Sequence, residues 1–204
     1  EDVGDDLLAV LTGQLVTTGA RLTASRARLM TRIAEAAAVV YADITHGETL
    51  DLSFLPSWNK TESGIVSPGD AGDEAFARQR LEAAAKATRN EERSRATSIF
   101  GPHRDDVRVI VAGRDARLFG SQGQQRTVAL AWKLAEVAVI SEVSGAKPIL
   151  LLDDVMSELD TIRRSAMAAL VTEQVQTVIT TTNLQYFERD LLDRAKVVEL
   201  THGT

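Results

Sequence analysis

Two adjacent carboxylates follow a short apolar stretch near residue 150. Residues 149–152 are Ile-Leu-Leu-Leu, and Asp153 and Asp154 come directly after them. Such a run is typical of a buried strand in a parallel sheet, and α/β proteins bind ligands beyond the carboxyl ends of these strands. A carboxylate there can hold Mg²⁺ beside nucleotide phosphates, and a second one can polarise or deprotonate a water. The pattern indicates either a site for phosphate chemistry or two solvated acids that end a strand.

A second group of residues lies at the expected start of a long helix. Ser121 and Gly123 precede a segment whose apolar residues recur with helical spacing as far as Ile140. Unpaired N–H groups at a helix start attract anions, and a glycine lets a phosphate approach the backbone closely. The simpler interpretation is that Ser121 is only the N-cap. Arg126, in the first turn, either forms a salt bridge or supports a phosphate or a partner subunit electrostatically.

Basic residues gather in two helical stretches, although the formal net charge of the chain is −6. Residues 7–34 contain no acid, and residues 78–95 are rich in arginine. Each stretch is either a solvated helix face or a surface that follows nucleic-acid phosphates. The candidate DNA-binding residues are Arg21, Arg26, Arg28 and Arg32.

Two long helices and an α/β region must position these groups. Leucines at 8, 15, 22 and 29 predict a long first helix, residues 49–55 alternate like a strand, and residues 73–97 predict a second helix. We expect residues 1–97 to form an antiparallel helical arm with a small β tip. In residues 98–204 we expect strands at 107–111, 116–119, 148–152, 177–180 and 197–200, and helices at 121–144, 159–172 and 184–194, in a mainly parallel sheet.

Composition excludes several classes of protein. The chain has 204 residues, 44% of them apolar, which suffices for a hydrophobic core. It has no cysteine, so disulfides, thiolate zinc sites and cysteine nucleophiles are excluded. No apolar run approaches the roughly 20 residues of a membrane span.

The order and spacing of these groups resemble RecF, a family of ABC-type recombination-repair ATPases related to the SMC proteins. Residues 121–126 resemble the signature motif and residues 149–154 the Walker B strand. Residues 157–160 resemble the D-loop. The cluster Gly-Pro-His-Arg-Asp-Asp at 101–106 and the strand leading into three threonines at 180–182 complete the resemblance.

The resemblance implies an α/β, ABC-type ATPase head fragment with a lobe II-like arm, and it assigns roles to residues. Asp153 would serve Mg²⁺, and Asp154 would be the catalytic carboxylate. The residues expected to contact ATP held by a second subunit are Ser121, Gln122, Gly123, Gln124, Gln125 and Arg126. The residues expected across the ATP-dependent dimer interface are Ser157, Glu158, Leu159 and Asp160. Many ABC proteins have a histidine at the switch position, where this chain has threonines.

The resemblance also implies a cytoplasmic protein of DNA replication, recombination, repair and the SOS response. The intact protein would bind ATP and Mg²⁺, form a homodimer with ATP, bind double-stranded DNA near single-strand gaps, and work with RecR and RecO. One alternative is another SMC-like or ABC-type repair ATPase, against which the short arm and residues 101–106 argue. The other is a non-catalytic module that binds DNA or a partner protein.

The phosphate-binding loop G-x-x-x-x-G-K-[ST] is absent from the sequence. We therefore expect this chain to be the C-terminal part of a RecF-like protein that begins within the arm. The intact protein would be a weak ATPase, and the chain alone would be inactive. A truncated head would also expose a sheet edge and apolar surface, so we expect the chain to self-associate.

Overall fold

The computed structural model describes residues 2–58, 67–173 and 175–200. The helices are α1 (Asp2–Thr45), α2 (Pro68–Ala71), α3 (Glu74–Arg95), α4 (Ala116–Phe119), α5 (Gln122–Ser144), α6 (Thr161–Glu173) and α7 (Arg189–Arg194). Short 3₁₀ helices are η2 (Pro102–Arg104), η3 (Val155–Glu158) and η4 (Leu184–Tyr186). The strands are β1 (Leu50–Leu55), β2 (Asp106–Val111), β3 (Arg114–Asp115), β4 (Leu150–Asp153) and β5 (Thr177–Thr180).

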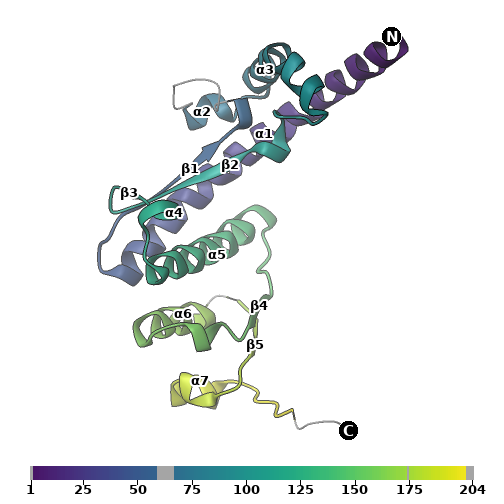
Figure 1. The fold of residues 1–204 in the computed structure, drawn as a ribbon. Coiled ribbons are helices and arrows are strands. Elements are labelled where there is room, and N and C mark those ends of the chain that lie inside the picture. The colour runs from purple at the N-terminus through teal and green to yellow at the C-terminus, as the bar shows by residue number, and fades with distance from the viewer. Residues whose placement is uncertain (1, 59–66, 174, 201–204) are drawn as a thin grey trace.

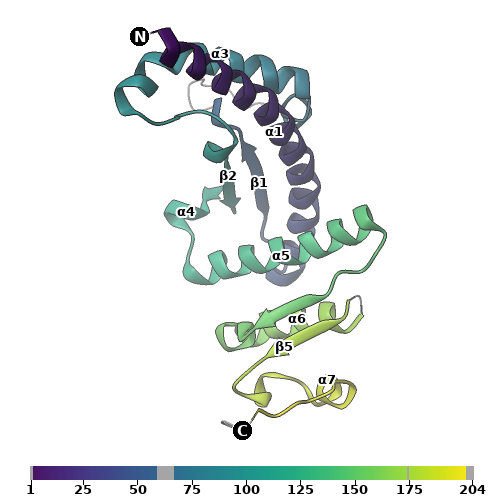
Figure 2. The same cartoon turned by 90° about the vertical axis from the view of Figure 1, so that its right-hand side faces the viewer.

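The elements are stacked along one direction. Helix α1 runs the length of the upper half beside α3 and the β1–β2 ribbon, and α5 crosses its inner end (Figures 1 and 2). Below α5 lie α6 with the pair β4 and β5, and then α7 (Figure 1). Within the described residues, no helix combines the length and the apolar character needed to cross a membrane.

The two-helix arm predicted from the sequence is confirmed. Small buried residues, among them Ala20 and Ala24 of α1 and Ala77 of α3, let the two helices approach closely around Leu81. Helix α3 begins where the Asp73 carboxylate accepts a hydrogen bond of 2.7 Å from the Phe76 amide. An N-cap of this kind satisfies one of the unpaired donors of the first turn.

β1, which was expected to be a small β tip of the arm, belongs to a three-stranded antiparallel sheet with β2 and β3. β1 pairs antiparallel with β2 from Leu50 opposite Val111 to Leu55 opposite Asp106. Leu50 and Leu52 lie in one buried cluster with residues of α1, β2 and α5. The burial of these two leucines holds β1 against α1 and α5. The sheet and the cluster both cross the expected boundary between residues 97 and 98, and the division of the chain there stays a prediction.

Two further strands predicted from the sequence are absent from the part of the chain that the structure describes. Residues 116–119 form α4, because the Asp115 carboxylate caps the Arg117 amide and ends the two-residue strand β3. Residues 197–200 have no partner strand among the described residues, and Val198 and Leu200 are exposed. The strands predicted at 148–152 and 177–180 are confirmed as β4 (Leu150–Asp153) and β5 (Thr177–Thr180).

Residues 101–106 are tied to α1 and to the turn after β1 through one buried carboxylate. Asp105 accepts hydrogen bonds from the Ser57 amide (2.9 Å) and the Thr23 hydroxyl (3.2 Å), and Arg26 lies 3.5 Å away. Arg26 also donates to the Pro102 carbonyl at 2.6 Å. Burial raises the pKa of Asp105, and these donors partly oppose that rise. The cluster is therefore a polar clamp between α1 and the loops that lead into β2.

We expect Arg26→Gln to lower the free energy of unfolding by about 1–2 kcal/mol, because it removes charge-assisted hydrogen bonds and leaves Asp105 buried without a cation. Arg21→Gln is the matched control on the same helix. Arg21 has no hydrogen-bond or ion-pair partner among the described residues, so its loss should change the free energy by less than about 0.5 kcal/mol. Urea unfolding of both variants measures the difference, and equal losses would contradict the clamp.

Candidate functional site

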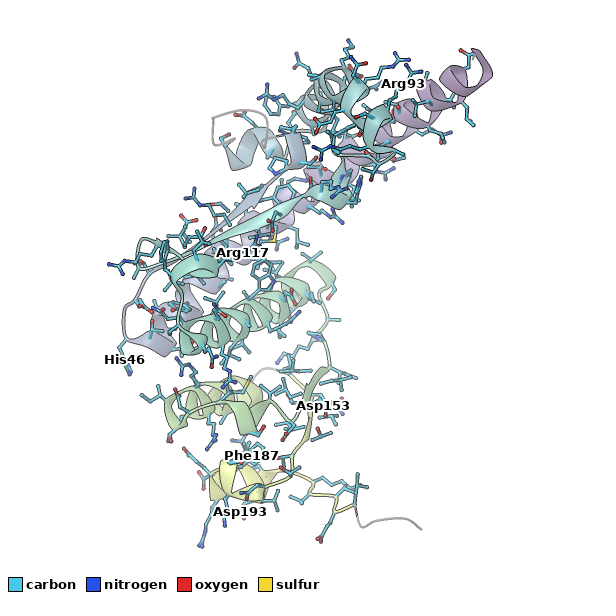
Figure 3. The ribbon with its side chains drawn as sticks, in the orientation of Figure 1. His46, Arg93, Arg117, Asp153, Phe187 and Asp193 are labelled. Atoms are coloured by element: carbon cyan, nitrogen blue, oxygen red, sulfur yellow. The ribbon has the colours of Figure 1, made fainter. Side chains whose placement is uncertain are left out.

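The parallel pairing of β4 and β5 builds the acidic edge of the site. The register sets Asp153 opposite Thr180, at the carboxyl ends of both strands. The Thr180 hydroxyl donates a hydrogen bond to Asp153 Oδ1, and the Asp154 amide donates to the Thr180 carbonyl at 3.2 Å. Asp153 stays exposed beside the strands (Figure 3). Thr180 thus orients a carboxylate that solvent and ligands can reach.

Asp154 has two unusual features. Its backbone is left-handed, with φ 46°, a conformation that costs a non-glycine residue about 1–3 kcal/mol unless its surroundings enforce it. The Ser157 hydroxyl lies 3.0 Å from its Oδ2, whereas its Oδ1 is buried and has no hydrogen-bond partner among the described residues. A buried carboxylate oxygen without a partner is costly, and such exceptions gather at functional sites. Both features fit a residue that a ligand or water completes.

The donor set of this edge fits part of a magnesium shell. Carboxylate oxygens of Asp153 and Asp154 and the hydroxyls of Thr180 and Ser157 are hard oxygen donors, which Mg²⁺ prefers. Throughout the described ranges, no group of three or more His, Asp or Glu side chains is placed to hold a metal by itself. A bound Mg²⁺ would therefore take its remaining ligands from phosphate and water, as is usual for this ion.

The start of α5 is a complete capping box. The Ser121 hydroxyl accepts a hydrogen bond from the Gln124 amide (3.1 Å), and the Gln124 side chain accepts one from the Ser121 amide (3.0 Å). Since Ser121 Oγ acts as acceptor, its own proton remains available for an anion. The Gln125 side chain donates to the carbonyls of Ala116 and Gly120. Gln124 and Gln125 therefore shape the turn, whereas Ser121 and Gln122 are exposed at its tip and Arg126 is exposed on the first turn.

Glu48, which the sequence did not single out, links the first turn of α5 to helix α1. Glu48 accepts a hydrogen bond from the Gln124 side chain at 2.9 Å and another from the Tyr41 hydroxyl at 2.7 Å. Burial raises the pKa of Tyr41, and the hydrogen bond to Glu48 adds to the rise. No local signal distinguishes Glu48 from other residues of the turn after α1. Its role depends on contact with a residue far along the chain.

The predicted D-loop wraps the start of α6. Leu159 is buried with Met156, and the Asp160 carboxylate accepts a hydrogen bond from the Arg163 amide at 3.0 Å. Arg164 donates to the Met156 carbonyl at 2.9 Å and lies over the Tyr186 ring at 4.2 Å. The side chain of Glu158 lies outside the described residues. The loop is therefore fixed by its own helix rather than left free.

The four candidate DNA-binding arginines differ in their contacts. Besides the Arg26 contacts, Arg28 donates to the Gly72 carbonyl at 2.5 Å, and Arg32 pairs with Glu142 at 2.8 Å. These contacts give the three residues structural roles within the chain. Arg21 alone of the four has no such partner in the described part of the structure and is exposed.

Comparison with known proteins identifies the family. A protein called "DNA replication and repair protein RecF" from Symbiobacterium thermophilum is 45% identical over 90% of this chain and 47% of its own length. RecF of Synechococcus sp. strain JA-3-3Ab is 39% identical over 96% of this chain and 50% of its own length. RecF of Geobacillus thermodenitrificans is 38% identical and is matched over 53% of its length. The chain belongs to the RecF family.

Solved structures agree with this assignment. A structure described as "the recombination mediator protein RecF-ATPrS in RecFOR pathway" superposes with a TM-score of 0.73 at 29% identity, over 88% of this chain and 46% of the other. The corresponding RecF-ATP structure gives a TM-score of 0.71 at 30% identity. The expected fold class, an ABC-type head with a helical arm, is confirmed, with β4 and β5 as its parallel sheet in the described residues. No protein-family profile matches the chain. The chain spans about half the length of the RecF relatives that it matches.

We expect Ser121→Ala to lower the free energy of unfolding by about 1 kcal/mol, because the cap of α5 is lost. Ser121→Thr keeps a hydroxyl at the cap and should lie close to the unsubstituted chain. Chemical unfolding followed by circular dichroism measures both variants. An equal loss in the two would show that the hydroxyl does not hold the start of the helix.

Proposed function

We propose that this chain is the C-terminal half of a RecF-type ATPase whose intact subunits pair around ATP and bind double-stranded DNA near single-strand gaps. The observation that carries the proposal is that a chain 38–45% identical to RecF proteins has both an acid-tipped parallel strand and a capped helix start. Each is one half of a composite nucleotide site.

Asp153 and Asp154 have separate roles in this proposal. Asp153, oriented by Thr180 and exposed, holds Mg²⁺ beside the phosphates of ATP bound to the same subunit. Asp154 accepts a proton from, or polarises, the attacking water. Its buried oxygen without a partner supports this role, because a water at that position would satisfy it. Thr181 and Thr182 follow β5 at the switch position.

The start of α5 acts on the ATP of the other subunit. The free backbone N–H groups of the first turn and the Ser121 proton present donors to a phosphate, and the helix dipole favours its negative charge. The exposed tip formed by Ser121 and Gln122 is accessible to a second molecule. Ser157 and Asp160 of the D-loop lie at the same interface in this proposal.

The surface around β4 and β5 supports the proposal that the remaining half of the intact protein covers it. Leu151 of β4 is 72% exposed, and Ile149 and Val178 are also exposed. An apolar face of this kind on a parallel sheet is normally buried. We place the phosphate-binding loop, and with it tight ATP binding, in the covering half. The same face should make the isolated chain self-associate.

The partners of the intact protein follow from its relatives. The solved RecF structures that this chain resembles are described as belonging to the RecFOR pathway, so we propose RecR and RecO as partners of this protein too. The proposed compartment is the cytoplasm, where DNA is repaired.

We expect the isolated chain to show no Mg²⁺-dependent ATP hydrolysis. We expect the intact protein to hydrolyse ATP slowly, and Asp154→Asn to reduce that rate about 100-fold, because a general base contributes roughly that factor. Asp193→Asn on α7 is the control and should leave the rate unchanged. A steady-state phosphate-release assay with and without Mg²⁺ measures the rates. Turnover by the isolated chain that Asp154→Asn abolishes would refute the division of the site.

We expect Arg21→Gln in the intact protein to weaken binding to duplex DNA and to lower the slope of log K against log salt by about 1, because one phosphate contact is lost. Arg21 suits this test better than Arg26 or Arg28, because each of those two residues donates a hydrogen bond within the chain. Arg189→Gln, in α7 far from the arm, is the control (Figure 1). Titration of fluorescent duplex DNA at several salt concentrations gives the slopes. An unchanged slope would leave α1 a solvated face.

A further inference from the structure

Arg163 lies between two motifs that the sequence treats as separate. It is the third residue of α6, and its side chain is only 22% exposed. A positive charge in the first turn of a helix interacts unfavourably with the positive end of the helix dipole. Its position therefore calls for compensating contacts, and those contacts come from both the D-loop and the start of α5.

The contacts with α5 reach the glycine of the signature motif. Arg163 Nε donates to the hydroxyl of Thr127, which is fully buried and donates in turn to the Gly123 carbonyl at 2.8 Å. A Cβ atom on Gly123 would lie 3.3 Å from Arg163 Nη2. The guanidinium thus packs against the backbone of Gly123 and fixes the first turn of α5 through Thr127.

The contacts with the D-loop come from the same side chain and its backbone. Arg163 Nη1 forms an ion pair with the Asp160 carboxylate, which also accepts the Arg163 amide at 3.0 Å. A guanidinium donates along several directions of one rigid plane, whereas an ammonium is a single point charge. A lysine could form the ion pair with Asp160 but could not donate a hydrogen bond to the Thr127 hydroxyl at the same time. The neighbouring Arg164 turns to Met156 and Tyr186, so it does not duplicate the link.

We propose that Arg163 is a positioning residue that locks the D-loop to the start of the signature helix, so that both elements meet the partner subunit as one rigid unit. The inference rests on the proposed ATP-dependent pairing of intact subunits. Because Arg163 acts through Thr127 and Asp160 and not on the nucleotide, it should affect the pairing step and the rate of hydrolysis, but not the binding of ATP to a single subunit.

The test uses the intact protein with Arg163→Lys, Arg163→Ala and the control Arg189→Ala. Sedimentation velocity across protein concentrations measures ATP-dependent dimerisation, a fluorescent ATP analogue measures nucleotide affinity at low protein concentration, and thermal unfolding checks folding. We expect Arg163→Lys to keep the melting temperature and to hold nucleotide affinity within about twofold. It should require roughly tenfold more protein to dimerise, since charge-assisted hydrogen bonds are lost.

A double-mutant cycle separates positioning from general stability. If Arg163 acts through Thr127, Thr127→Val combined with Arg163→Lys should impair dimerisation no more than the stronger single variant. The inference would be overturned if folded Arg163→Lys dimerised with ATP at the same protein concentration as the unsubstituted protein. It would also be overturned if the effects of the two substitutions on dimerisation were additive in the cycle. Failure of the unsubstituted protein to dimerise with ATP would instead refute the proposed function.

Discussion

The first turn of α5 can act on a phosphate only if its donors point outward while its flanks stay fixed. A helix start has several N–H groups without internal partners, and a loop that moves would lose their common direction. The structure meets this requirement from three directions: the capping box of Ser121 and Gln124, the Glu48 carboxylate, and Arg163 acting through Thr127. All three sets of contacts come from the chain's own residues. Electrostatic stabilisation of this type depends on such preorganisation.

The acidic edge is built on a different principle. Parallel pairing of two short strands brings Asp153 and Thr180 to the same edge, and the left-handed backbone of Asp154 turns the chain into η3. This edge is incomplete by itself, since one oxygen of Asp154 is buried without a partner in the described residues and the apolar face beside it is open. Within the described residues, the Ser121 and Gln124 side chains at the start of α5 have partners, whereas the acidic edge leaves one carboxylate oxygen without a partner and an apolar face exposed. This asymmetry is consistent with a site shared between polypeptide segments.

The parts of the fold that depend on interactions between residues close in the sequence could be predicted from local sequence patterns. The long helices, the strands β4 and β5, and the capped start of α5 follow from hydrophobic periodicity and capping residues in the sequence. The pairing of β1 with β2 could not be predicted, because strands 50 residues apart carry no signal of their register. For the same reason, Glu48 and Arg163 were missed: each acts on a residue distant in the chain. The prediction of strands at 116–119 and 197–200 rested on short apolar runs. The Asp115 cap favours a helix at 116–119, and residues 197–200 have no partner strand among the described residues.

Helix α1 is unbroken from Asp2 to Thr45, and the clamp at Asp105 grips it near its midpoint, at Thr23 and Arg26. At 1.5 Å per residue, the helix extends about 36 Å outward from Arg26 and about 28 Å inward. The outer part of the helix packs against α3, and its inner part packs against β1 and α5. Near the inner end the Tyr41 hydroxyl donates to Glu48, which also accepts a hydrogen bond from the Gln124 side chain at the start of α5. One unbroken helix therefore connects the packing of the arm with the contacts that hold the capped turn.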